Sequence, residues 1–150
     1  MQIASYALVG WSVFVLVQSL FFKFSGHEET RIIFTTIAAW MAGIGLPAAI
    51  YAPFESIGGY VIGGAELVAA GLLLLPKTRL YGALLTIGVL SGAIFFHLFT
   101  PLGVVRVVDA AGNTDNGELF AMACSVWLAC ALLVAMHWWD ARRAATRSAD

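Results

Sequence analysis

Four long apolar segments, nearly free of charge, constrain this chain more than any other feature of its sequence. They are residues 3–22, 56–75, 80–99 and 119–139. A helix needs about 20 consecutive apolar residues to cross the hydrocarbon core of a bilayer. Hydrophobic residues make up 61% of the 150 and charged residues 11%. Because a domain of this size cannot bury that much apolar surface in its own core, we predict a membrane protein with four helical spans.

A fifth apolar stretch, residues 32–50, differs from these four. Ser25 and Glu28 have the spacing of a capping box, which predicts a helix over about 26–42. Helix-breaking glycines and prolines follow it, at Gly43, Gly45, Pro47 and Pro53. A helix of about sixteen residues with a charged first turn suits the membrane surface better than a span.

The basic residues near the span ends predict the orientation of the chain. With four spans, the side of the termini holds Lys77, Arg79, Arg142, Arg143 and Arg147, and the other side holds Lys23, Arg31 and Arg106. This distribution predicts both termini in the cytoplasm and the protein in the cytoplasmic (inner) membrane. A fifth span over 32–50 would satisfy the charge rule better, but it would leave no loop before Ser56, so we predict four spans.

The third loop, residues 100–118, is different in character from the other connections. Val104–Val108 has strand character, and Asp109–Gly117 is rich in turn residues. The predicted fold is therefore an all-α, four-transmembrane-helix bundle forming a single membrane domain over residues 1–150. A short interfacial helix follows the first span, a hairpin-like loop follows the third, and residues 141–150 form a polar tail.

Glu66 is the one charged residue inside a predicted span. A carboxylate near the bilayer midplane costs several kcal/mol, so it should face the bundle and be either paired or protonated. Gly59, Gly63 and Ala70 share its helical face, and these small residues predict close approach of another helix. Glu66 therefore either holds the bundle together or handles protons or a ligand.

Further polar residues lie in the half of the predicted bundle that is remote from the termini. His97 lies near the end of the third span, where Gly88 and Gly92 predict close packing. Lys23 closes the first span, and Gln18 lies about 7 Å deeper along the same helix. With Glu66, these residues form either a pocket or a set of separate interfacial contacts.

The loop residues Arg106, Asp109 and Glu118 are candidates for the cap of such a pocket, or for a solvated salt-bridge cluster. The aromatic residues Phe95, Phe96 and Phe99 near His97 either pack and face lipid or line a groove for a quinone or a lipid tail.

Several classes of function find no support in the sequence. A net charge of −1 provides no basic surface for nucleic acid. No second histidine or cysteine lies at ligand spacing from His97, so we predict no metal site. Cys124 and Cys130 would lie about 9 Å apart along a helix, too far for a disulfide. No motif for a covalently bound cofactor is present, and the catalytic residues, if there are any, are unknown.

A series of short motifs follows the order of the predicted helices. They are Phe22-Lys23-Phe24, Gly45-Leu-Pro47, Gly63-Gly-Ala-Glu66-Leu67 running into Gly71-Leu-Leu-Leu-Leu-Pro76, Gly92-Ala-Ile-Phe-Phe-His97-Leu, Thr100-Pro-Leu-Gly103, and an Asp/Gly-rich turn before Glu118-Leu-Phe-Ala121. Together they resemble the DoxX-like family of small four-helix membrane proteins. The loop over 104–116 is longer than expected for a plain member.

The resemblance implies several functions. Namesake members are subunits of thiosulfate:quinone oxidoreductases, others belong to oxidative-stress complexes, and animal relatives assist receptor assembly. Our first hypothesis is a quinone-interacting subunit that works with another membrane or peripheral redox protein, with Glu66 or His97 relaying protons, since histidine as a residue type titrates near neutrality. The alternatives are a non-enzymatic scaffold or assembly factor and a small proton-coupled or lipid-handling transporter. Self-association is also open.

Overall fold

The computed structural model describes residues 2–147, and it is built from helices. They are α1 (Gln2–Phe24), α2 (Glu28–Gly43), α3 (Ala48–Leu74), α4 (Arg79–Phe99) and α5 (Glu118–Arg147). Four of them, α1, α3, α4 and α5, are long and apolar enough to cross a membrane. Within the described range the chain forms no strand, only an isolated bridge between Val107 and Thr114 in the third loop. The predicted all-α bundle with four candidate spans is confirmed.

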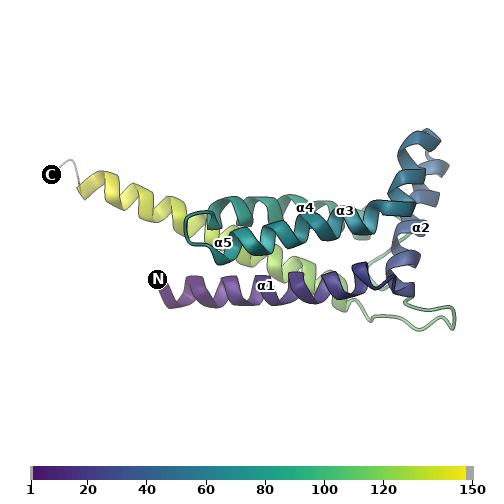
Figure 1. Ribbon diagram of the computed structural model, residues 1–150, viewed down its shortest axis with the longest axis horizontal. Coiled ribbons are helices and arrows are strands. Elements are labelled where there is room, and N and C mark those ends of the chain that lie inside the picture. The colour runs from purple at the N-terminus through teal and green to yellow at the C-terminus, as the bar shows by residue number, and fades with distance from the viewer. Residues whose placement is uncertain (1, 148–150) are drawn as a thin grey trace.

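The four long helices run side by side along the long axis of the molecule, whereas α2 lies across one end (Figure 1). The packed pairs are α1 with α3, α3 with α4, α4 with α5, and α5 with α1, so the helices form a ring in chain order. The start of α1 and the end of α5 lie at the end opposite α2 (Figure 1). The bundle therefore has an α2 end, which also carries the third loop, and a terminal end.

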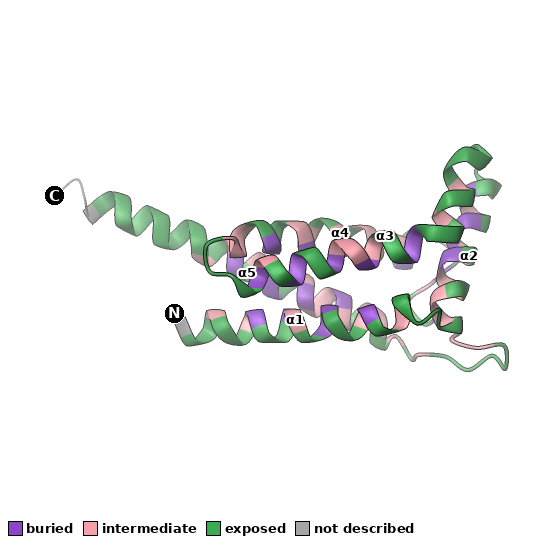
Figure 2. Ribbon diagram, viewed as in Figure 1, coloured by how far each residue is buried: buried purple, intermediate pink, exposed green. Residues whose placement is uncertain are grey.

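Burial follows the ring. The main core lies between the four long helices and includes Leu16, Leu73, Val126 and Cys130. Many large apolar side chains point outward instead, among them Phe14, Phe21, Leu67 and Leu128, and the outward faces of the ribbons are exposed along most of their length (Figure 2). Lipid is the solvent that such faces require, which agrees with the composition argument.

The helix boundaries differ from the predicted ones in three places. Helix α3 begins at Ala48 rather than near Ser56, so Pro53 lies inside its second turn. The missing N–H of Pro53 removes one helical hydrogen bond there without ending the helix. Helix α2 begins at Glu28, two residues later than predicted.

The predicted capping box does not form in this segment. His27 is the N-cap residue and makes no side-chain cap bond, while the Ser25 hydroxyl donates to the Phe22 carbonyl instead. At the other terminus, α5 continues through the predicted polar tail to Arg147, and residues 148–150 of that tail lie outside the described range.

The tightest helix contact lies at Gly82, beside the turn between α3 and α4. A Cβ atom at this position would lie 2.6 Å from the backbone nitrogen of Leu73 and 3.0 Å from the carbonyl oxygen of Ala69. The predicted close packing at Gly88 and Gly92 is wrong, because a Cβ atom would meet nothing within 4 Å at either position. The spacing of small residues identified the right helix but the wrong glycines.

Gly82→Ala should therefore destabilise the bundle, whereas Gly88→Ala should not. Backbone atoms cannot yield to the new methyl group, so we expect the free energy of unfolding to fall by about 1–3 kcal/mol for Gly82→Ala. Gly88→Ala adds the same methyl group in open space and should leave stability unchanged or raise it by up to about 1 kcal/mol. Denaturant titration of both variants in one detergent makes the comparison, and equal stabilities would contradict the contact at Gly82.

Candidate functional site

Glu66 is paired inside the bundle. The Lys23 ammonium group lies 3.0 Å from Glu66 Oε1 and 2.8 Å from Oε2, and the Ser19 hydroxyl donates to Oε2 at 2.9 Å. Lys23 also donates to Ser19, one helical turn away on α1. Glu66 is only 4% exposed, so its carboxylate is largely removed from bulk water, while Lys23 is partly buried. Lys23 turns inward to meet the carboxylate instead of making a separate contact at the membrane surface.

The small residues on α3 make room for this pair. Gly59, Gly63, Glu66 and Ala70 are all buried on one face, as predicted. A Cβ atom at Gly63 would lie 3.1 Å from the Phe24 ring and 3.5 Å from Cδ of Lys23. The missing side chain thus leaves the space that the aliphatic part of Lys23 occupies as it crosses from α1 to α3.

A second charged cluster surrounds Arg106 of the third loop, at the α2 end of the bundle. Arg106 is 3% exposed, and its guanidinium group pairs with Glu29 of α2 and with Asp115, whose Oδ2 lies 3.2 Å from Arg106 Nε. Asp115 also accepts the backbone N–H of Arg106 at 3.1 Å. The cluster therefore ties the loop to itself and to α2. The prediction of a solvated salt-bridge cluster is wrong here, because the arginine is buried.

Asp115 is held in its ionised form by this loop. Desolvation, the largest single influence, raises its pKa, but backbone hydrogen bonds from Arg106, Gly117 and Leu119 and the charge of Arg106 together outweigh it and lower the pKa below its ordinary value. Asp109 also has a lowered pKa, because the Asn113 side chain and backbone donate to it. Asp109 therefore stabilises its own turn rather than the charged cluster.

His97 is fixed by the same loop. Its Nδ1 lies 2.6 Å from the carbonyl oxygen of Gly103, so Nδ1 carries the hydrogen and donates it. In the neutral ring this leaves Nε2 as an acceptor. His97 is buried, and its ring packs edge-on against Phe120 of α5.

A cavity of about 340 Å³ lies between these groups at the α2 end of the bundle. All five helices and the third loop line it. Its apolar lining includes Phe22, Ile33, Phe34, Ile37, Phe54 and Phe96, and its polar lining is Gln18, Ser19, Lys23, Glu29, Thr30, Glu66, His97, Arg106 and Glu118. The α2 helix and the loop cover the cavity like a cap, and a small second core of Ile37, Met41 and Leu102 holds this cap together.

The structure brings together most of the predicted site residues. Lys23 and Glu66 touch, and Gln18, His97, Arg106 and Glu118 line the same cavity. Phe96 lines it as well, whereas Phe95 and Phe99 lie outside and are largely exposed. Asp109 does not reach the cavity.

Three functional partners were missed in the sequence: Ser19, Glu29 and Asp115. Ser19 lies four residues before Lys23, which places it on the same helical face, so its position carried a usable signal. The pairing of Glu29 and Asp115 with Arg106 depends on how the loop folds, and no local spacing indicated it.

Comparison with known proteins identifies no relative of this chain. No protein-family model matches the chain, and neither a curated protein nor a solved structure matches it. Among the described residues, no group of three histidine, cysteine, aspartate or glutamate side chains could hold a metal ion. The resemblance to the DoxX-like family therefore rests on the sequence motifs alone, and the cavity and its residues indicate the function.

Removing one member of the buried ion pair should lower the free energy of unfolding far more than removing one member of an exposed pair. Glu66→Gln leaves Lys23 without its counter-charge inside the bundle, and we expect a loss of about 3 kcal/mol or more in the free energy of unfolding. Glu28→Gln is the matched control, because Glu28 pairs with Arg31 at 3.5 Å with both side chains well exposed, and such pairs contribute about 0–1 kcal/mol. Lys23→Met combined with Glu66→Gln should recover part of the loss, and strict additivity in this double-mutant cycle would rule out direct coupling.

The loop around Arg106 should loosen at acid pH. An ordinary aspartate titrates near 3.8. Because folding lowers the pKa of Asp115, its carboxylate stabilises the loop above that pH, and the contribution is lost as pH falls through the lower folded pKa. Hydrogen exchange at the Arg106 amide, corrected for its intrinsic pH dependence, should therefore accelerate below pH 3.8.

Two alanine variants separate the role of Asp115 from that of its neighbour. Asp115→Ala should expose the Arg106 amide already at neutral pH, because the acceptor is gone. Asp109→Ala should leave that amide protected, since Asp109 bonds only within its own turn. Protection that persists in Asp115→Ala would disprove the proposed anchor.

Proposed function

We propose that this protein binds a quinone in the cavity beneath α2 and acts as the quinone-interacting subunit of a membrane redox complex. In the proposed arrangement the protein lies in the cytoplasmic membrane with both termini in the cytoplasm, and α2 lies at the opposite membrane surface. A second membrane or peripheral protein supplies or accepts the electrons.

The observation that carries the proposal is the buried Arg106 at the wall of an apolar cavity. Its Nη1 atom is buried and has no hydrogen-bond partner in the described part of the chain. A buried donor that lacks an acceptor costs about 1–3 kcal/mol, and more for a charged group. Nη1 itself has almost no accessible surface, so a carbonyl oxygen in the cavity would satisfy this donor only if the guanidinium group turned toward the cavity. The apolar ring of such a ligand would lie against the aromatic lining.

The other polar groups supply the remaining chemistry of a quinone site. A quinone carries carbonyl acceptors, and the quinol formed from it by two electrons and two protons carries hydroxyl donors. His97 Nε2 is a free acceptor at the cavity wall, because Nδ1 is committed to Gly103. As two electrons leave the quinol for the redox partner, His97 would accept one of the two hydroxyl protons and the other would leave to water. Glu66 is less suited to this relay because Lys23 already neutralises it.

Two glycines on α4 give a matched test of binding in this cavity. Gly92 lines the cavity and Gly88 does not, and a Cβ atom meets nothing at either position. Gly92→Leu should fill part of the cavity without disturbing the fold, whereas Gly88→Leu points its added side chain elsewhere. We expect added quinone to raise the melting temperature of the wild type and of Gly88→Leu, and to leave that of Gly92→Leu unchanged.

Mild detergent extraction from the native membrane, followed by identification of co-purifying lipids and proteins, tests the same proposal independently. Quinone that co-purifies with the wild type but not with Gly92→Leu supports it. Absence of quinone together with an unchanged melting temperature on its addition would overturn it. Recovery of a stoichiometric membrane-protein partner without quinone would then favour the scaffold function, for which Val104, Val105 and Val107 offer an exposed apolar surface on the loop.

A further inference from the structure

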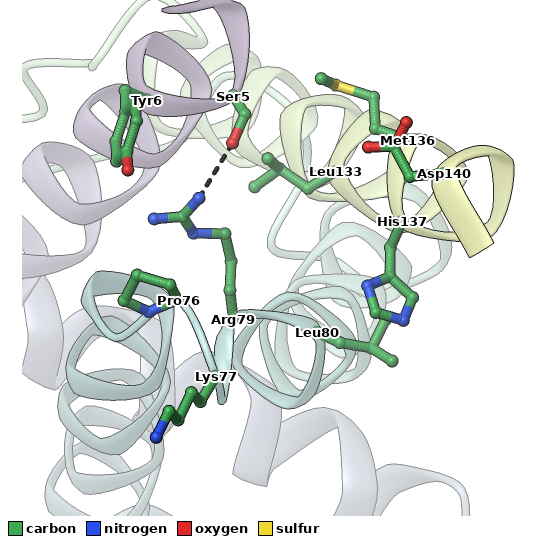
Figure 3. Close-up of a pocket in the computed structure, with 10 residues that line it drawn as sticks. All are labelled: Ser5, Tyr6, Pro76, Lys77, Arg79, Leu80, Leu133, Met136, His137 and Asp140. Atoms are coloured by element: carbon green, nitrogen blue, oxygen red, sulfur yellow. Dashed lines mark hydrogen bonds between the residues drawn. The ribbon is translucent and has the colours of Figure 1, made fainter. Parts of the chain in front are cut away.

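A second cavity lies at the terminal end of the bundle, remote from the cap. Its volume is about 320 Å³, within the range of roughly 300–1,000 Å³ that small-molecule sites occupy. It lies between the start of α1, the turn from α3 to α4, and the α5 residues Leu133, Met136, His137 and Asp140 (Figure 3). None of its lining residues takes part in the proposed quinone site.

Arg79 is the organising side chain of this cavity. Its Nη1 donates to the Ser5 hydroxyl at 3.0 Å, its Nε donates to the Leu73 carbonyl at 3.2 Å, and its guanidinium group lies 5.0 Å from the centre of the Tyr6 ring. Figure 3 shows the guanidinium group extended across the cavity toward Ser5 and Tyr6. Three contacts from two helices thus fix its position before any ligand arrives.

No carboxylate in the described part of the chain forms an ion pair with Arg79 or with Lys77. Asp140 lines the cavity from α5, but it lies on the side away from the guanidinium group (Figure 3). A guanidinium group has five N–H donors in a planar fork, and the protein acceptors named above use two of them. The remaining donors match the oxygens of a phosphate or a carboxylate, and phosphate is the anion that a membrane surface supplies.

The aromatic residues around this end place the cavity at the level of lipid headgroups. Tyr6, Tyr81, Trp138 and Trp139 are all exposed here, at the ends of candidate spans. Tryptophan and tyrosine concentrate at the membrane–water interface, and basic pockets between transmembrane helices bind the headgroups of anionic lipids. The cavity therefore meets phosphate groups at its own depth in the bilayer.

We propose that the cavity at Arg79 is a binding site for a phosphate group, supplied by an anionic phospholipid such as phosphatidylglycerol. The Arg79 fork binds the phosphate oxygens, and Ser5 and Tyr6 hold the fork in place. A lipid bound in this cavity would contact both α1 and the turn between α3 and α4 and so connect them.

The test compares the protein in phosphate-free detergent with phosphatidylglycerol, with phosphatidylcholine and with inorganic phosphate. We expect phosphatidylglycerol to raise the melting temperature more than phosphatidylcholine does, because the choline cation offsets the charge of the phosphate that both lipids carry. Native mass spectrometry should show preferential retention of phosphatidylglycerol. In Arg79→Gln this preference should disappear, with an apparent affinity for phosphatidylglycerol lower by about tenfold or more. In Arg142→Gln, which removes the same charge from an exposed residue outside the cavity, the preference should remain.

Because Arg79 also bonds the end of α3, the readout is the difference between the two lipids within each variant, which cancels any change in intrinsic stability. Arg79→Lys keeps the charge but loses the fork, and it should bind phosphatidylglycerol with an affinity between those of the wild type and Arg79→Gln. An Arg79-dependent shift with inorganic phosphate would support the site and identify free phosphate as its source. Equal effects of the two lipids without a phosphate effect, or a lipid preference that survives in Arg79→Gln, would overturn the proposal.

Discussion

The ion pair between Lys23 and Glu66 is the interaction on which the rest of this bundle depends. A carboxylate in the middle of an apolar helix is tolerated only when another group neutralises it. Lys23 can do so because Gly63 leaves space for its aliphatic part, and Ser19 completes the hydrogen bonding of the carboxylate. The pair therefore fixes both the distance and the rotation of α1 relative to α3, and these two helices in turn define one wall of the cavity.

The cap over the cavity depends on a different kind of interaction. The third loop contains hardly any regular structure, and yet it presents a buried arginine at a defined place, because Arg106 is held by Glu29 of α2 and by Asp115 of the loop itself. The same loop holds His97 through the carbonyl oxygen of Gly103. A segment that looks like a simple connection thus sets the position of both groups to which we assign contacts with the ligand.

The sequence predicted the architecture because the bilayer imposes a length and a polarity on every span. The location of Glu66, its small-residue face and its need for a partner followed from the same constraint. The sequence could not show that α3 continues through Pro53, because one lost hydrogen bond is tolerated in a long apolar helix. Nor could it identify Gly82 as the closest contact, since Gly82, Gly88 and Gly92 look alike until the neighbouring helix is placed. The partners of Arg106 were out of reach for two further reasons. Glu29 lies 77 positions away on α2, and the pairing with Asp115, in the same loop as Arg106, depends on how that loop folds.

The spacing of the two charged clusters along the chain has a consequence for how the protein is made. Lys23 and Glu66 are separated by 43 positions, and Glu29 and Arg106 by 77. Chains are synthesised from the N-terminus, and their early parts begin to fold first. The charge of Glu66 is therefore neutralised as soon as α3 follows α1 into the membrane, while α4 and α5 are still to come. Arg106 follows α4 in the chain, so the cap can close only after α4 has been made, and the α2 end of the cavity stays open until late in assembly.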